Sequence, residues 1–171
     1  VLIDTGTVSK DLILAARQHG TPSNGTFWLS AEALTLGTDT TNPGGGPDAA
    51  MSGSGTNNYR RTSFATVATM TNRLTYWPAS TATRTALTGS FRVFAVVRRS
   101  ATTSAITVRL DWGRAGAATT DNATVTLPLS TSRIMVDLGL VDFSAPGATV
   151  LPDPRLSFLA ARSGGTDTLD W

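Results

Sequence analysis

The residue types that carry most enzyme chemistry are scarce in this chain. Histidine occurs once, as His19, and cysteine is absent from all 171 residues. A Ser-His-Asp triad would depend on that one histidine, and thiol catalysis and sites built from several histidines or cysteines are excluded. Glu32 is the only glutamate, and no spacing pairs it with an aspartate as a glycosidase requires. The sequence therefore predicts a protein that is not an enzyme.

Aromatic side chains are the best candidates for ligand binding. Sugar rings stack on exposed aromatic faces, and tryptophan offers the largest face. Trp28 and Trp77 lie at or near the ends of expected strands, and Tyr59 ends a long polar loop. These three are the candidate ligand-binding residues, and packing in a core or a partner interface is their competing role. Trp112 falls on the apolar face of its own strand and is expected in the core.

Charge is low and nearly balanced. Fourteen basic residues oppose twelve acidic ones, giving a net charge of +2, and charged residues make up 15% of the chain. The usual share is ~25%. The densest basic spots are only the pairs at 60–61 and 98–99, so nucleic acid is not an expected partner. No apolar run approaches the ~18 residues of a membrane-spanning helix, so no membrane span is expected.

Short alternating patterns of apolar and polar residues predict the elements that must position these side chains. Strand-like segments occupy residues 31–36, 64–77, 91–98, 106–112, 123–127, 134–140, 156–160 and 168–171. Turn signals separate them, and no helical pattern stands between them. This arrangement predicts an all-β protein, an antiparallel β-sandwich or jelly roll, and argues against a parallel α/β sheet.

The alternation also predicts which side chains point into the sandwich. Residues expected to face inward are Val93, Ala95, Val97, Ile106, Val108, Leu110, Ile134, Val136, Leu138 and Phe158. Leu140 continues the pattern of Ile134, Val136 and Leu138 and is expected on the same face.

Two parts of the chain stand outside the regular pattern. Residues 1–30 are an N-terminal extension, a candidate assembly arm, before a sandwich domain over residues 31–171. Within the extension, residues 11–17 fit a short helix between Ser9 and Gly20, and fit a strand nearly as well. Residues 37–58 form a long loop rich in Gly and Pro, and it lacks the lysine of a phosphate-binding loop. Because such a loop gains little from packing on its own domain, we expect it to contact another chain.

Residues 89–98 resemble part of a known fold. Their Gly-x-Phe-x-Val pattern, followed by arginine, resembles a strand of galactose-binding-like jelly rolls. Residues 133–141, 156–162 and 163–171 continue the strand order of that fold. Together the strands look like jelly-roll domains of bacteriophage tail and baseplate-associated proteins. The resemblance covers residues 60–171, with residues 32–36 as a candidate first strand, and it leaves the N-terminal block unexplained.

The resemblance implies a metal site. The same fold serves non-catalytic carbohydrate-binding modules, some of which hold a structural calcium ion between a glutamate of the first strand and an aspartate of the last. Glu32 and Asp170 stand at comparable places in this chain. Carboxylate oxygens suit calcium, which takes 6–8 such ligands. No other cofactor is expected.

The resemblance and the lack of catalytic residues together favour one function. They indicate a non-enzymatic structural protein of a phage-like virion, in its tail or baseplate, that acts in assembly and in glycan adhesion. Its partners would be other copies of itself, other virion proteins and a cell-surface glycan. The alternative is a carbohydrate-binding module of a secreted bacterial enzyme. An exposed aromatic platform would favour the module, and large apolar contacts between chains would favour the particle.

Overall fold

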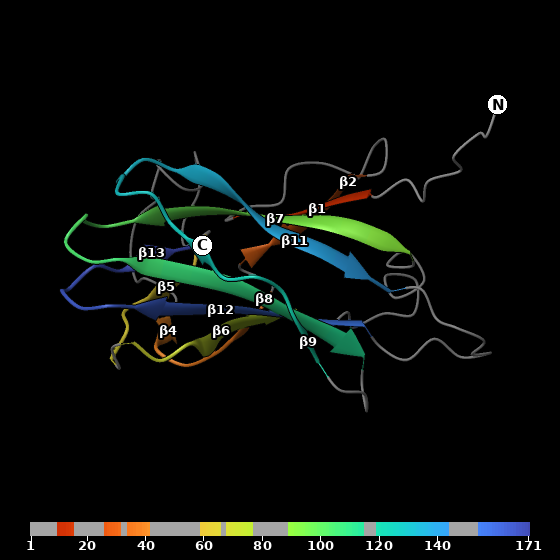
Figure 1. The fold of residues 1–171 in the computed structure, drawn as a ribbon, viewed down its shortest axis with the longest axis horizontal. Coiled ribbons are helices and arrows are strands. Elements are labelled where there is room, and N and C mark those ends of the chain that lie inside the picture. Colours follow the sequence, from red (N-terminus) through yellow and green to blue (C-terminus); the bar gives the residue numbers. More distant parts are fainter. Residues whose placement is uncertain are drawn as a thin grey trace.

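The computed structural model describes residues 10–15, 26–31, 34–41, 59–65, 68–76, 89–114, 119–143 and 154–171. These residues form two β-sheets packed face to face, and they contain no α-helix (Figure 1). The strands are β1 (Lys10–Ala15), β2 (Thr26–Ser30), β3 (Thr35–Leu36), β4 (Thr40–Thr41), β5 (Arg61–Thr62), β6 (Thr71–Tyr76), β7 (Ser90–Arg99), β8 (Ile106–Arg114), β9 (Thr120–Asp121), β10 (Val125–Thr126), β11 (Ile134–Asp142), β12 (Pro154–Arg162) and β13 (Leu169–Asp170). The predicted all-β sandwich is confirmed.

The first sheet is built around β7. Its strand order is β2-β1-β7-β13-β5-β4, and β11 lies along the other edge of β7. β1 covers the first half of one β7 edge, from Phe91 to Ala95, and β13 covers Arg98 and Arg99. β1 runs parallel to both β2 and β7. The expectation of a purely antiparallel sandwich is therefore wrong for this sheet.

Residues 10–15 adopt the strand alternative rather than the helix. Leu12 and Leu14 point into the sandwich and are fully buried, and Leu29 of β2 is almost so. A strand places two residues of period two on one face, and β7 supplies the backbone partners that such a strand needs. The described part of the N-terminal block is therefore built into the sandwich.

The second sheet is built around β8 and β12. Its order is β10-β8-β12-β6-β3, with β9 beside β10 along the same edge of β8. All of its pairings are antiparallel. Figure 1 shows β8, β12 and β6 in one layer, with β7 and β11 in the layer above them.

The core between the sheets confirms nearly all of the predicted inward positions. The predicted residues of β7, β8 and β12 are fully buried, and Val136 and Leu138 of β11 are 7% and 1% exposed. Ile134 is only half-buried and packs against the edge of the core. Trp112 is also half-buried, and its ring meets Phe143 edge-on at 6.0 Å.

Leu140 is where the predicted alternation fails. It is 58% exposed, while Val141 beside it is 1% exposed. The β7–β11 register shifts between Asp137 and Gly139, because β11 carries one extra residue there. Such a β-bulge reverses the faces of all residues after it, so the expectation that Leu140 faces inward is wrong.

The start of the long loop belongs to the fold. Thr40 and Thr41 form β4 against β5, and the Thr40 and Thr62 hydroxyls are 2.9 Å apart. A Cβ on Gly37 would lie 2.3 Å from the carbonyl oxygen of Asn72, so only glycine fits at that point. The rest of the predicted contact loop, residues 42–58, lies outside the described residues.

Candidate binding groove beside strand β11

The aromatic candidates do not form a described platform. Tyr59 is 7% exposed, and the Arg61 guanidinium lies 5.4 Å from the centre of its ring. The backbone of Trp28 belongs to β2, where it is the register partner of Ile13, but its side chain is not among the described atoms. Trp77 lies outside the described residues. Of the three candidates, only the Tyr59 side chain is described, and it is buried rather than presented to a ligand.

The predicted calcium pair cannot be assembled from the described residues. Glu32 lies outside them, and Asp170 is 1% exposed. Both carboxylate oxygens of Asp170 accept hydrogen bonds from Arg61, at 2.7 and 2.8 Å. In the described part of the chain, no three His, Cys, Asp or Glu side chains gather where they could hold a metal ion. Asp170 therefore closes the β5–β13 pair by an ion pair.

The most deeply buried charges also hold the fold together. Asp167 is fully buried and accepts a hydrogen bond of 2.5 Å from Arg99, and the Thr103 hydroxyl and backbone bond to the same carboxylate. Burial alone would raise the pKa of Asp167, but these hydrogen bonds outweigh it and hold the pKa below its ordinary value. Asp167 is thus a charged anchor for the turn before β8.

Two further buried arginines lie against an aromatic ring. The guanidinium groups of Arg73 and Arg162 lie 4.9 and 5.5 Å from the ring centre of Phe64. Burial lowers the pKa of Arg73, and its ion pair with Asp39 opposes that effect. Arginine titrates far above neutral pH, so the Arg73 guanidinium stays charged. These arginines stabilise the sandwich by cation–π contacts and backbone hydrogen bonds.

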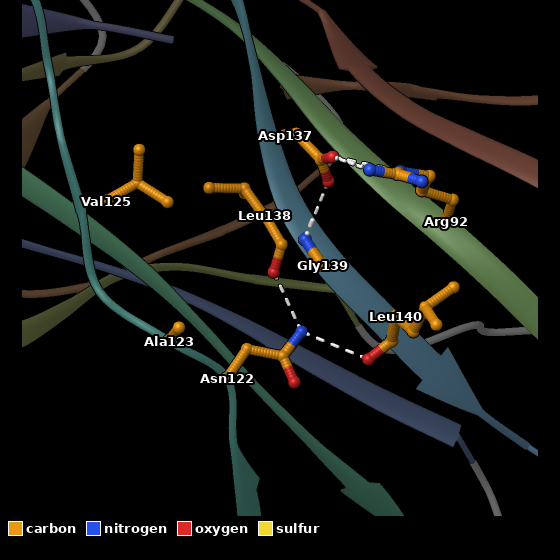
Figure 2. Close-up of a pocket in the computed structure, with 8 residues that line it drawn as sticks. All are labelled: Arg92, Asn122, Ala123, Val125, Asp137, Leu138, Gly139 and Leu140. Carbon is orange, nitrogen blue, oxygen red and sulfur yellow. Dashed lines mark hydrogen bonds and ion pairs between the residues drawn. The ribbon is translucent and has the colours of Figure 1, made fainter.

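A hollow lies between β11 and the segment linking β9 to β10. Its volume is about 540 Å³. Its lining residues are Arg92, Asn122, Ala123, Val125, Asp137, Leu138, Gly139 and Leu140. In Figure 2, Asn122, Ala123 and Val125 line one side, the β11 residues line the other, and Arg92 extends from β7. We call this hollow the β11 groove.

Asn122 ties the two sheets together at one end of the β11 groove. Its Nδ2 donates to the carbonyl oxygens of Leu138, at 2.8 Å, and Leu140, at 3.1 Å (Figure 2). Its Oδ1 accepts a hydrogen bond from Trp112 Nε1 at 3.1 Å. Asn122 follows a strand of one sheet, while both carbonyls belong to a strand of the other. One amide therefore occupies part of the outer edge of β11.

An ion pair forms the polar end of the groove. Arg92 Nε donates to Asp137 Oδ2 at 2.9 Å, and Asp137 Oδ1 accepts from the Gly139 backbone at 2.9 Å. The hydrogen bonds from Arg92 hold the pKa of Asp137 below its ordinary value, so both groups are charged at neutral pH. Arg92 is 54% exposed and Asp137 37% exposed. They offer charge and hydrogen bonds rather than a group ready to accept a proton.

Three exposed apolar side chains belong to β11 and the loop that leads into it. Met135 is 62% exposed on β11, Leu140 is 58% exposed after the bulge, and Leu129 is 68% exposed in the loop that leads into β11. Large apolar side chains on one strand and its entry loop are a feature of contact surfaces.

The sequence reasoning missed these groove residues. The available signal was Gly139, because a glycine inside an alternating strand indicates a bulge or a close backbone approach. The pairing of Arg92 with Asp137 and the hydrogen bonds of Asn122 to β11 join positions 16–45 residues apart, and no local pattern indicates such contacts.

The comparisons with known proteins add no family. No family model, no curated protein and no solved structure matches the chain. Within the described ranges, no helix has the length and apolar character needed to cross a membrane. The β11 groove and the exposed residues beside it are therefore the basis for a functional proposal.

Proposed function

We propose that this chain is a non-enzymatic structural domain that acts by contacts between proteins in a larger particle. The observation that carries the proposal is the exposure of Leu129, Met135 and Leu140, which all belong to β11 or its entry loop. Exposed apolar residues on an ordered strand favour binding to another protein surface over catalysis. The particle that fits the sequence resemblance is a phage-like virion, with the chain in its tail or baseplate.

The ionisable residues support a structural role. Asp167 and Asp170, the buried acids of the described residues, are each held by an arginine. Asp137 in the β11 groove is likewise paired with Arg92. Charges committed to each other stabilise a scaffold, and each of these three carboxylates is held by an arginine. Glycan adhesion by the same particle would use the open, polar end of the β11 groove.

Purified particles test the proposal directly. Phage-like particles from cells that encode the chain would be separated on a density gradient and probed with an antibody raised against the purified chain. We expect the chain to sediment with the particles and to resist a high-salt wash, because apolar contacts do not weaken with salt as charge pairs do.

The carbohydrate-binding module is the outcome that would contradict this role. In that case the chain would be found in the culture medium rather than in the particle fraction, and it would be retained by an insoluble polysaccharide. Retention by cellulose, chitin and cell-wall material, with serum albumin as the control protein, measures this second property.

A further inference from the structure

Strand β11 is an edge strand, and exposed apolar residues lie on it and in the loop before it. Within the described residues it pairs with β7 alone. Four large apolar side chains are exposed in the described part of the chain, and Leu129, Met135 and Leu140 all belong to β11 or its entry loop. Edge strands usually carry charges or short lengths that prevent pairing with another chain. β11 is nine residues long, and it presents exposed Met135 and Leu140 beside its charged residue Asp137.

The second half of this edge is already occupied. Asn122 donates to the carbonyl oxygens of Leu138 and Leu140, and the bulge at Gly139 bends the strand there. The regular part of β11 before the bulge, Ile134 to Asp137, has no such cap in the described structure. A strand that adds to β11 would therefore add before the bulge.

The sequence of that regular part is complementary to itself in an antiparallel arrangement. If a twofold axis passes through Met135, then Met135 meets Met135 of the second copy and Ile134 lies opposite Val136. Arg133 then lies opposite Asp137, and the twofold axis repeats that pair on the other side. Opposite charges directly across an antiparallel pair are stabilising, and like charges are destabilising. In this register each Asp137, which also bonds to Arg92 of its own chain, would lie opposite Arg133 of the other copy, on either side of an apolar centre.

The outer face of the sheet continues the same surface. Phe94 and Val96 of β7 are the register partners of Asp137 and Met135, and both are half-buried on that face. Ile13 of β1 pairs with Phe94 and is half-buried as well. A second copy joined at β11 would extend this half-buried apolar face across the axis.

We propose that β11 pairs antiparallel with β11 of a second copy of this chain, about a twofold axis at Met135, and so joins the first sheets of two copies into one continuous sheet. The inference rests on the proposed assembly role and names the partner and the register. A twofold contact must be self-complementary, and the Arg133–Asp137 pairing meets that condition.

Cysteine cross-linking tests the register, because the chain contains no cysteine of its own. Residues directly opposite in an antiparallel pair have Cα atoms about 4.5–5.5 Å apart, within the range that a disulfide bridges. We expect Met135→Cys to give a disulfide-linked dimer under mild oxidation. Arg133→Cys and Asp137→Cys should each stay unlinked alone, because equal positions there lie about 13 Å apart across the axis. An equimolar mixture of those two variants should cross-link.

Leu129→Cys is the matched control. It is at least as exposed as Met135 but lies outside the proposed strand pair, so it should form no disulfide-linked dimer under the same oxidation. Equal cross-linking of the Met135 and Leu129 variants, or none by Met135→Cys at concentrations where the parent chain dimerises, overturns the proposed register.

Charge exchange gives a second test in solution. Arg133→Asp places two acids opposite each other, and Asp137→Arg places two arginines opposite each other. Each variant alone should dimerise about tenfold more weakly in sedimentation equilibrium. Their mixture restores both opposite-charge pairs across the axis, although the Arg92–Asp137 pair stays broken in one partner, and it should dimerise more tightly than either variant alone. A mixture that dimerises no more tightly than either variant overturns the pairing.

These results separate the inference from the function on which it rests. Chains that sediment with particles but show no Met135 cross-link would retain the assembly role and refute the β11 pair. Chains that cross-link as expected but are absent from particles would retain the pair and refute the virion assignment.

Discussion

At the scale of single residues, Gly139 controls how β11 continues. Its φ is +93°, a conformation that L side chains rarely adopt. A Cβ on this residue would also lie 2.9 Å from Asn122 Nδ2, which is held by hydrogen bonds to two carbonyl oxygens. The glycine therefore allows both the bulge and the approach of Asn122 that ties the sheets together.

We predict that Gly139→Ala lowers the free energy of unfolding by about 1–3 kcal/mol, because the backbone must hold a strained φ and the Asn122 amide must move. Urea denaturation followed by tryptophan fluorescence measures the change. Gly164→Ala is the matched control, since a Cβ there meets no atom within 4 Å, and its effect should stay within about 0.5 kcal/mol. Equal effects of both substitutions would contradict the role given to Gly139.

Asp167 gives a second prediction at this scale. Its pKa is lowered in the folded state, so its contribution to stability is complete above the pKa of the unfolded chain and is lost as pH falls through the folded pKa. Asp167→Asn leaves Arg99 buried without its anion and should cost about 3–5 kcal/mol at neutral pH. The variant should also lose less stability than the parent on acidification below about pH 4.

Urea denaturation at a series of pH values measures both effects of Asp167→Asn. Asp137→Asn is the control, because its ion pair with Arg92 is substantially exposed, so this substitution should change stability much less than Asp167→Asn. If the unfolding free energies of the parent chain and the Asp167 variant fell equally at low pH, protonation of Asp167 would not be the cause of the parent's loss of stability.

At the scale of elements, the bulge divides β11 into two halves with opposite faces. Leu138 lies within the shift and is 1% exposed, and Leu140 follows it and is 58% exposed. A strand without a bulge would bury both leucines, because they are two positions apart. The regular first half is the part that we propose pairs with a second copy, and the second half is bound to Asn122.

We predict that Leu138→Ala costs about 2–5 kcal/mol of unfolding free energy, because it leaves a cavity between the sheets. Leu140→Ala removes the same atoms from an exposed site and should change stability by no more than about 0.5 kcal/mol. Chemical denaturation of the two variants side by side measures the difference. Similar costs at both positions would place the bulge elsewhere in the strand.

At the scale of the whole molecule, the first sheet depends on the N-terminal block. β1 lies between β2 and β7, and it covers the half of the β7 edge that β13 leaves open. Leu12, Leu14 and Leu29 come from this block and belong to the core. The strands of residues 10–15 and 26–30 therefore behave as parts of one sandwich with the rest of the described chain.

We predict that removal of residues 1–30 unfolds the domain or lowers its thermal midpoint by more than about 10 °C. Burying each leucine contributes about 1.5–3 kcal/mol, and about 1 kcal/mol shifts the midpoint of a domain of this size by several degrees. Circular dichroism during heating measures the change, and a chain lacking only residues 1–8 is the control. An unchanged midpoint after removal of residues 1–30 would make the block a dispensable arm.

The sequence by itself determined the fold class and most of the core. Alternation of apolar residues along β7 and β8 predicts a face that must be buried, and the structure buries those residues, because side-chain direction in a strand follows from local backbone geometry. The scarcity of His, Cys and Glu likewise limits catalytic chemistry before any folding is considered.

Only the tertiary structure decided which strands became neighbours and where β11 reversed its faces. The choice of strand over helix for residues 10–15 depended on a free edge of β7 some 80 residues later. Asn122 meets Leu138 and Leu140, and Arg61 neutralises Asp170 across 109 residues. Contacts of this kind depend on how distant segments pack together, so the periodicity of each segment alone contains no signal for them.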